Sequence, residues 1–363
     1  MKVSFTCMNT YDDPEALSRV FTATPRALWD PERGKRAVQD ALALAGLADQ
    51  AGFDYVSVSE HHYQAGMCNP NPALTAAALT RVVEEAGIAL LGPLVSMNNP
   101  VRIAEELAML DQLSGGRLIA MPLRGTPNEF VNYNVSADET RGRTEQAMLL
   151  IKRALSEPEP FSWKSEYYDF PVVSVWPGPT QVPHMPLYSS ANSPDSGSFA
   201  AKNGFGAGCS YFGPKRVAQL MQHYRQECAA AGWTPRPDQM LYRAFCVVGN
   251  DPAHADGLVA RFRGDAPPPG PGSRPDDRPA SGPQRPGGSP QEDAGFAFGF
   301  LQFHGDPDAL VAQIREFHEL TGVGILDLSF NFGYYSFEET AEQIATFGSK
   351  VLPRIRSLAT VGA

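Results

Sequence analysis

The stretch ERGKRAVQDALALAGLADQAGFDYVSVSE, residues 32–60, shows a helix-then-strand pattern that indicates the fold class. Apolar residues recur every three or four positions over 32–52, which predicts an amphipathic helix, and the β-branched run YVSVSE at 55–60 predicts a strand. The same alternation continues along the chain, where further short apolar runs are separated by segments of helical period. The predicted strands cover residues 2–7, 55–60, 88–95, 118–125, 185–191, 204–211, 242–249 and 325–332.

Strands that are nearly continuous in apolar residues and are separated by helices indicate a parallel sheet covered on both faces. Eight such units and a final helix over 337–358 predict a closed (β/α)8 barrel, a fold that commonly takes roughly 250 residues as one domain. An open doubly wound sheet is the alternative that the pattern leaves open. We therefore expect residues 1–363 to form a single barrel domain of the α/β class.

Residues 264–293 interrupt this pattern before the last predicted strand. Pro, Gly, Ser and Asp dominate the segment, and it has hardly any apolar side chain. Burial cannot offset the entropy lost on ordering such a stretch, so the composition predicts a mobile insertion. Two interpretations stay open, a lid over the catalytic face of the barrel and an inert surface excursion.

Composition excludes several classes of partner. The chain has 40 acidic and 30 basic side chains, a net charge of −10, which argues against binding to nucleic acid or to an anionic membrane. It has no apolar run of about 18 residues and no secretory signal pattern, so no membrane span is expected. The five cysteines are widely spaced and form no CxxC motif, which favours reduced thiols in the cytoplasm.

Polar side chains stand at the end of the second predicted strand, where (β/α)8 barrels place their active sites. Glu60, His61 and His62 follow the apolar run directly. Histidine titrates nearest to neutral pH, so these residues are candidates for acid–base chemistry. Adjacent residues of a strand point to opposite faces, so the two histidines should not share one ion, and we expect no metal site.

Two further segments are candidates for binding an anion. Leu123, Arg124 and Gly125 close the fourth predicted strand, and the arginine fork suits a phosphate. Residues 192–198, a strand-to-helix junction rich in helix-capping residues, should present free backbone N–H groups. The alternatives are an ion pair between Arg124 and an acid such as Glu106 or Glu129, and simple helix capping over 192–198.

Taken in order, these motifs resemble the bacterial luciferase family of flavin-dependent monooxygenases. The resemblance covers about residues 1–260 and 296–356 and rests on an ordered set of four motifs. They are EHH at 60–62, NNPVRIAEELAMLDQLSGGRL at 98–118, LRG at 123–125 and PGPTQVPHMPLYSSANSPDSGSFAAKNGFG at 177–206.

The resemblance implies roles for several of these residues. His61 matches the catalytic histidine beside the reactive edge of the flavin, with Glu60 packed behind it. Arg124 matches the phosphate-binding arginine, and Leu123 before it is assigned to the same cofactor site. The second half of the phosphate site falls on Asn192, Ser193 and Ser196; the family often has Glu where Asn192 stands, which leaves the contact of Asn192 open.

Two further positions complete the cofactor site that the resemblance implies. Relatives carry a non-proline cis peptide beneath the isoalloxazine ring, and alignment places it at Leu91–Gly92. Tyr211 matches an aromatic position near the flavin, with ordinary barrel packing as the alternative.

The implied function is a two-component monooxygenase. A separate flavin reductase would supply reduced FMN, and molecular oxygen would form a flavin hydroperoxide that oxygenates a small organic substrate. Many deazaflavin-dependent relatives carry Asp at the position of Glu60, so Glu favours FMN. Two alternatives stay open, a deazaflavin-dependent oxidoreductase and a non-catalytic flavin-binding partner subunit. The resemblance also implies a homodimer, whereas the sequence does not identify the substrate.

Overall fold

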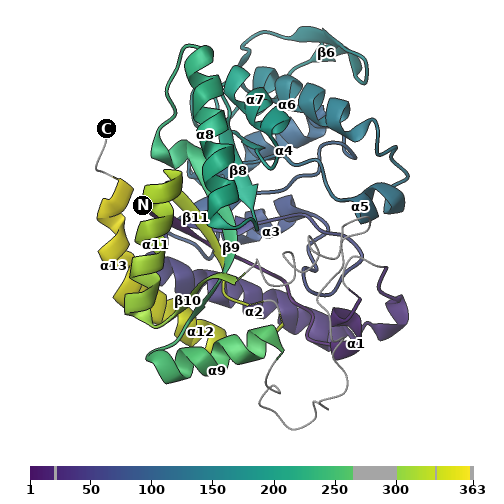
Figure 1. Ribbon diagram of the computed structural model, residues 1–363. Coiled ribbons are helices and arrows are strands. Elements are labelled where there is room, and N and C mark those ends of the chain that lie inside the picture. The colour runs from purple at the N-terminus through teal and green to yellow at the C-terminus, as the bar shows by residue number, and fades with distance from the viewer. Residues whose placement is uncertain (20–22, 265–300, 332, 360–363) are drawn as a thin grey trace.

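The computed structural model describes residues 1–19, 23–264, 301–331 and 333–359. In this part of the chain, eight parallel strands form a nearly closed barrel, with the order β4-β3-β2-β1-β11-β9-β8-β7 (Figure 1). A bridge between Ala120 and Leu187 joins the two ends of this order. The predicted (β/α)8 barrel is therefore confirmed. The strands are β1 (Lys2–Thr6), β2 (Tyr55–Val58), β3 (Gly87–Leu90), β4 (Leu118–Ala120), β7 (Tyr188–Ser190), β8 (Gly206–Ser210), β9 (Met240–Val248) and β11 (Ile325–Ser329).

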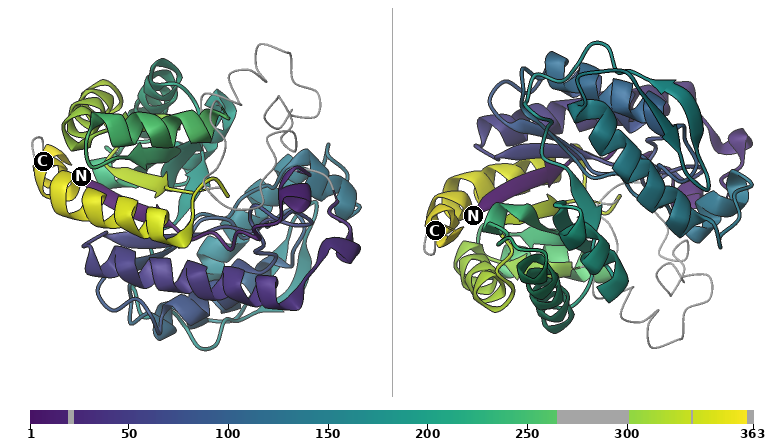
Figure 2. Two further views of the ribbon diagram at one scale, coloured as in Figure 1. Left: turned by 90° about the horizontal axis from the view of Figure 1, so that it is seen from below. Right: turned by 90° about the horizontal axis from the view of Figure 1, so that it is seen from above.

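Helices form an outer layer around these strands (Figure 2). Most begin with a proline after a capping residue, as in α2, where the Asp30 carboxylate accepts a hydrogen bond from the N–H of Arg33. Proline costs nothing at this position because its missing N–H would have no helical partner. The helices are α1 (Pro14–Leu17), α2 (Pro31–Gln50), α3 (Pro72–Leu79), α4 (Pro100–Leu113), α5 (Pro127–Asn132), α6 (Thr140–Ser156), α7 (Pro194–Lys202), α8 (Pro214–Ala230), α9 (Pro252–Arg263), α11 (Pro307–Thr321), α12 (Phe337–Thr346) and α13 (Leu352–Ile355).

Three strands were not predicted from the sequence. Strand β10 (Leu301–Gly305) pairs in parallel with the end of β9, so the sheet holds nine strands among the described residues. Strands β5 (Phe161–Lys164) and β6 (Asp169–Val173) form an antiparallel hairpin outside the barrel. The final helix predicted over 337–358 is present as α12, a π-helical turn, α13 and a last 3-10 turn.

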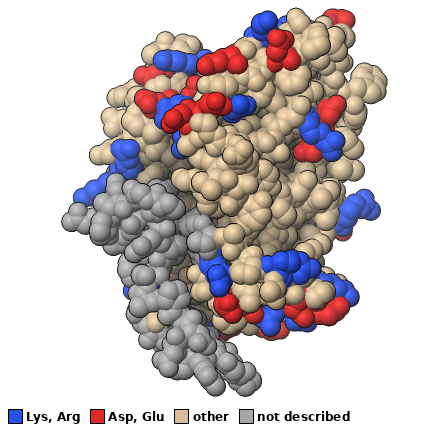
Figure 3. All heavy atoms as spheres, turned by 90° about the vertical axis from the view of Figure 1, so that its right-hand side faces the viewer, with Lys and Arg blue, Asp and Glu red and all other residues tan. Residues whose placement is uncertain are grey.

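The predicted insertion at 264–293 lies outside the described residues, except that Gly264 caps the C-terminal end of α9. All five cysteines are free thiols. No helix in the described ranges has both the length and the apolar character needed to cross a membrane. The face of the molecule in Figure 3 carries basic and acidic side chains interspersed, without a continuous positive patch.

The barrel interior is apolar at one level and polar at the next. Side chains from five strands form the apolar level: Ala89, Leu91, Ile119, Met121, Tyr188, Leu241 and Ile325. Closer to the carboxyl ends of the strands lie Ser57, Arg243 and Asp327, which bond to one another. The candidate site is built on the strand ends above this polar level.

Candidate functional site

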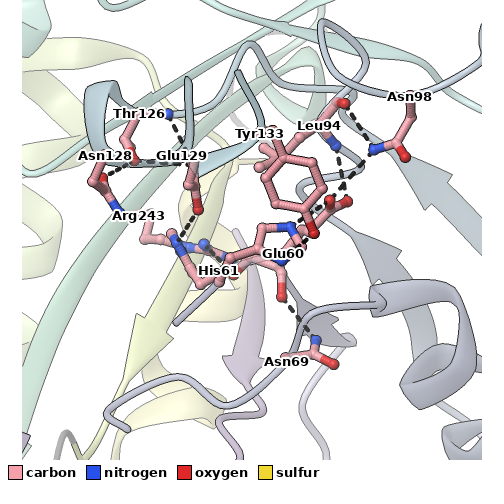
Figure 4. Close-up of polar contacts among 12 residues, drawn as sticks. Glu60, His61, Asn69, Leu94, Asn98, Thr126, Asn128, Glu129, Tyr133 and Arg243 are labelled. Carbon is pink, nitrogen blue, oxygen red and sulfur yellow. Dashed lines mark hydrogen bonds and ion pairs between the residues drawn. The ribbon is translucent and has the colours of Figure 1, made fainter. Parts of the chain in front are cut away.

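The segment after β2 presents two histidines that point to different partners (Figure 4). Asn69 holds this segment in place through two hydrogen bonds. Its side-chain amide donates to the backbone carbonyl of Ser59 at 2.7 Å, and its backbone carbonyl accepts from the N–H of His61 at 3.1 Å. His61 Nδ1 lies 3.3 Å from Glu129 Oε1, whereas His62 Nε2 lies 2.9 Å from Glu60 Oε1. The imidazoles therefore serve two separate networks. Within the described residues, no group of three or more His, Cys, Asp or Glu side chains is placed to hold a metal ion.

Glu60 is buried and ties the end of β2 to the segment after β3. Its carboxylate accepts from the N–H of Leu94 at 3.0 Å and from the amide of Asn98 at 3.4 Å, in addition to the bond with His62. The other nitrogen of His62, Nδ1, is bonded to the hydroxyl of Tyr133 at 2.9 Å. Among the described residues, Glu60 is thus bonded to His62 and not to the ring of His61.

Glu129 is the acid that holds His61, and sequence reasoning named it only as a possible partner for Arg124. Its side chain is 0% exposed, and one carboxylate oxygen accepts from both the N–H and the hydroxyl of Thr126 at 2.9 Å. Burial alone would raise the pKa of Glu129, but the bonds from His61 and Thr126 outweigh it, so the pKa lies below its ordinary value. Glu129 is therefore an ionised carboxylate at neutral pH, and it fixes the orientation of the imidazole.

Helix α5 contacts both histidines from one face. Glu129 and Tyr133 are four residues apart, a spacing that places side chains on the same side of a helix. One bonds to His61 and the other to His62. The Thr-Pro-Asn-Glu start of α5 is a capping box, a signal that identifies Glu129 as a helix-capping acid but not as the partner of His61.

We expect Glu129 to contribute stability at neutral pH that is lost in acid. Because its pKa is lower in the folded state, the contribution is complete above the unfolded pKa of about 4.3 and disappears as the pH falls through the folded pKa. The free energy of unfolding in urea should therefore fall from about pH 5 downward, and should fall less in Glu129→Gln. Glu106→Gln, which removes an acid paired with Arg102 on α4, is the control. Equal acid sensitivity of Glu129→Gln and the unmodified protein would contradict this interpretation.

The predicted cis peptide at Leu91–Gly92 is absent, which corrects the expectation drawn from the resemblance. Among the described residues, the cis bonds precede prolines, at Trp176–Pro177 and Val182–Pro183. The N–H of Leu91 continues the sheet by bonding to Val58, and Gly92 turns the chain with a φ of 146°. Glycine accepts this conformation freely, so the turn does not need a cis bond that costs about 3–4 kcal/mol. A Cβ on Gly92 would also lie 3.0 Å from the backbone nitrogen of Glu60, which is closer than ordinary van der Waals contact.

Arg124 has an exposed guanidinium with no acidic partner among the described residues. Neither acid named as its possible partner pairs with it, because Glu129 bonds to His61 and Glu106 pairs with Arg102 at 2.8 Å. Partial burial and the nearby cation Arg141 lower the pKa of Arg124. Two close guanidinium groups repel each other, so an anion between them would relieve an unfavourable interaction.

The N-terminus of α7 adjoins this pair of cations. Arg141 on α6 forms an ion pair at 3.1 Å with Asp195, which lies in the first turn of α7. Ser193 and Ser196 cap the helix: the hydroxyl of each accepts a hydrogen bond from the N–H of the other. These hydroxyls therefore act as helix caps, as the alternative interpretation predicted. A helix N-terminus also attracts anions through its free N–H groups. Arg141 was not recognised in the sequence, and its position brings Arg124 and the start of α7 into one region.

Three other predicted residues have structural contacts near the same strand ends. Asn192 accepts a hydrogen bond from the N–H of Ser210 at 3.2 Å, which ties the end of β7 to the end of β8. Tyr211 has a φ of 61° and stacks on Phe245, with ring centroids 5.8 Å apart. Leu123 bonds through its N–H to Pro93 and packs against the apolar level of the barrel. The predicted residues therefore gather at the carboxyl ends of β2, β3, β4, β7 and β8.

Comparison with curated proteins gives two relatives of moderate similarity. Uncharacterized protein y4wF of Sinorhizobium fredii is 30% identical over 228 residues, which is 62% of this chain and 66% of that protein. The oxygenase component of the flavin-dependent trigonelline monooxygenase of Acinetobacter baylyi is 27% identical over 226 residues, 61% of this chain and 62% of that protein. The chain thus spans just under two thirds of the length of these relatives.

Comparison with solved structures shows the same fold. The monooxygenase RslO1 from Streptomyces bottropensis has a TM-score of 0.76 at 23% identity and covers 97% of this chain and 99% of its own. The oxygenating constituent of the 3,6-diketocamphane monooxygenase of Pseudomonas putida, solved with FMN, has a TM-score of 0.72 at 17% identity and covers 98% of both chains. An F420-dependent secondary alcohol dehydrogenase has a TM-score of 0.68 at 17% identity and covers 98% of this chain and 99% of its own. The family profile of the luciferase-like monooxygenases matches residues 19–323, and the chain therefore belongs to the luciferase-like monooxygenase family.

Proposed function

We propose that this protein is the oxygenase component of a two-component, FMN-dependent monooxygenase that oxygenates a small organic substrate. The observation that carries the proposal is the pairing of two features at the carboxyl ends of the barrel strands, one after β2 and the other after β4. One is an imidazole held by a buried carboxylate, and the other is a guanidinium without an acidic partner among the described residues, close to a second guanidinium and a helix N-terminus. The first suits proton transfer, and the second suits a phosphate.

The residues present fit the phosphate of FMN. Arg124 and Arg141 offer two permanent positive charges, and the first turn of α7 offers the backbone N–H of Asp195 beside the hydroxyls of Ser193 and Ser196. A terminal phosphate carries close to two negative charges at neutral pH, so it would be matched by both cations. Gly125, with a φ of 94°, lets a ligand approach the backbone beside Arg124. In this proposal Leu123, Asn192 and Tyr211 line the remainder of the cofactor site.

Bound reduced FMN would supply the electrons that activate molecular oxygen, and the protein would position it and exclude water. His61 would hold or move the proton. Its Nδ1 donates to Glu129, so in the neutral ring Nε2 keeps its lone pair and faces away from that carboxylate. Glu60 would support this arrangement from behind by fixing the backbone between β2 and β3.

Several finer features of the proposal come from the relatives and from composition. The similarity to an oxygenase component supports a transient partner, a flavin reductase. The five free thiols suit a reducing compartment, so we place the protein in the cytoplasm, as a homodimer without a nucleic-acid or membrane partner. The second candidate is a deazaflavin-dependent oxidoreductase, favoured by the likeness to an F420-dependent dehydrogenase. A non-catalytic flavin-binding subunit is the third, although an ordered His61–Glu129 pair weighs against it.

Anaerobic titration tests the cofactor. The purified protein is titrated with reduced FMN and, separately, with a reduced deazaflavin, and oxygen is then admitted with candidate substrates. We expect tight binding of reduced FMN and substrate-dependent oxygen consumption. Preferential binding of the deazaflavin, with turnover that needs no oxygen, would replace the proposal with the second candidate. Binding of FMN without oxygen consumption for any substrate would favour the third.

A further inference from the structure

A buried ion pair lies inside the barrel directly below the candidate site. Arg243 of β9 and Asp327 of β11 are partners in the strand register, and their side chains form a salt bridge. The Asp327 side chain is 0% exposed and that of Arg243 is 10% exposed. The interior of a (β/α)8 barrel is ordinarily filled by branched apolar side chains, so a charged pair at this level needs an explanation.

The arginine crosses the interior of the barrel. Its Nη1 donates to Ser59 at 2.9 Å and its Nη2 donates to Ser57 at 3.3 Å. Strand β2 and strand β9 are not neighbours, because β1 and β11 lie between them in the sheet order. The bonds from Arg243 therefore span the interior. Asp327 is held in turn by the hydroxyls of Ser57 at 2.7 Å and Thr6 at 3.2 Å.

The pair is oriented with its positive end toward the site. Ser59 follows the last residue of β2, two residues beyond Ser57 and closer to the carboxyl ends of the strands, and Arg243 reaches both. Asp327 bonds to Ser57 and not to Ser59, so the carboxylate lies at the deeper level. Arginine has five N–H donors, and within the described residues three of them are engaged, which leaves one on each terminal nitrogen.

Arg243 is also linked to the proposed flavin site through two hydrogen bonds. Ser59, its partner, immediately precedes Glu60 and His61, and a Cβ added to Gly92 would lie 3.1 Å from the Cβ of Ser59. The carbonyl of Arg243 accepts a hydrogen bond from the N–H of Tyr211 at 3.0 Å. Figure 4 shows Arg243 in the same group as His61 and Glu129. A flavin ring placed among these residues would therefore lie above the guanidinium.

Stability alone is a weak reason for this pair. Desolvation of two buried charges costs as much free energy as their attraction returns, and replacement of such pairs by apolar residues is often neutral or stabilising. A bound flavin changes this comparison, since positive charge near its ring system favours the negatively charged reduced form.

We propose that Arg243 is an electrostatic residue of the flavin site, and that its cation favours binding of anionic reduced flavin over neutral oxidised flavin. This inference rests on the proposed function, because it takes FMN as the ligand. Asp327 moderates the effect by partly neutralising the cation from below. The pair thus sets the relative affinity of the site for the two redox forms, while Arg124 and α7 bind the phosphate of either form.

Equilibrium binding of both redox forms tests this inference without turnover. The dissociation constants of oxidised and reduced FMN are measured anaerobically for the unmodified protein and for Arg243→Gln/Asp327→Asn, which replaces the ion pair by neutral amides. In the double variant, we expect the affinity for reduced FMN to fall about tenfold relative to the affinity for oxidised FMN. That loss equals a shift of about 30 mV toward lower potential for the two-electron couple. Asp327→Asn alone leaves an uncompensated cation, so the ratio should shift in the opposite direction.

Two further variants make the test specific. Arg243→Lys keeps the charge, so it should stay near the ratio of the unmodified protein even if both affinities fall. Arg225→Gln removes a half-buried arginine that bonds to Thr321 at the other end of the barrel, and it should leave the ratio unchanged. Unchanged ratios in both the double variant and Asp327→Asn would overturn the role of Arg243 while leaving FMN as the cofactor. Failure of the unmodified protein to bind either form would overturn the proposed function itself.

Discussion

The variant His61→Ala is expected to bind FMN with nearly unchanged affinity and to lose at least about 100-fold in the rate of substrate oxidation. A positioned acid–base group contributes roughly 10²–10⁴-fold to a reaction, and His61 is the imidazole that a buried carboxylate orients. Reduced FMN should still be oxidised by oxygen, but more of the oxygen should appear as hydrogen peroxide. The measurement is the rate of substrate oxidation together with the yield of peroxide per FMN consumed.

Two comparisons make this result interpretable. His318→Ala removes a histidine of α11 that bonds to the carbonyl of Val323, far from the strand ends, and it should leave the rate unchanged. Residues that act as a unit are not additive, so His61→Ala/Glu129→Gln should be little slower than His61→Ala alone. Turnover of His61→Ala at the unmodified rate, without excess peroxide, would show that the role assigned to His61 is wrong.

The variant Arg124→Met should weaken FMN binding by about 10- to 100-fold and leave riboflavin binding almost unchanged. A hydrogen bond to a charged group contributes about 1.5–3 kcal/mol, and each 1.4 kcal/mol is a factor of about ten in affinity. Riboflavin lacks the phosphate, so it does not depend on the guanidinium. Fluorescence titration of both flavins gives the two dissociation constants.

The matched control for this prediction is Arg102→Met. Arg102 is a surface arginine on α4 that pairs with Glu106, and its removal should change neither affinity. A loss of FMN affinity that is matched by an equal loss for riboflavin would mean that Arg124 acts on the ring pocket or on folding. The phosphate assignment would then be wrong.

The alternation of apolar runs predicted a parallel sheet covered by helices, because burial on both faces leaves a strong signal in the sequence, and the count of eight units favoured the barrel over an open sheet. All eight predicted strands correspond to barrel strands in the structure. Strand β10 was missed because it has only five residues and follows a segment rich in Pro and Gly, so its apolar pattern is too short to indicate a strand. The hairpin β5–β6 was missed for a similar reason, and Pro171 inside β6 reads as a break in a strand.

The candidate site was predictable only in the parts that follow strand ends. His61 and Arg124 could be placed because they directly follow apolar runs. The contact of Glu129 with His61 joins positions 68 residues apart, and that of Arg243 with Asp327 joins positions 84 apart. Such pairings depend on how strands and helices close around the barrel, and no local pattern encodes them. The prediction of a cis peptide at Leu91–Gly92 was wrong because it rested on alignment alone.

In the proposed site, Arg124, the first turn of α7 and His61 surround one phosphorylated flavin. A crystal structure of the protein soaked with FMN tests this arrangement. We expect the phosphate within hydrogen-bond distance of Arg124 and of the α7 N-terminus, with the isoalloxazine ring beside His61 and Arg243. A phosphate bound elsewhere, or a ring that does not reach His61, would show that the proposed site is wrong and leave only the barrel and the family.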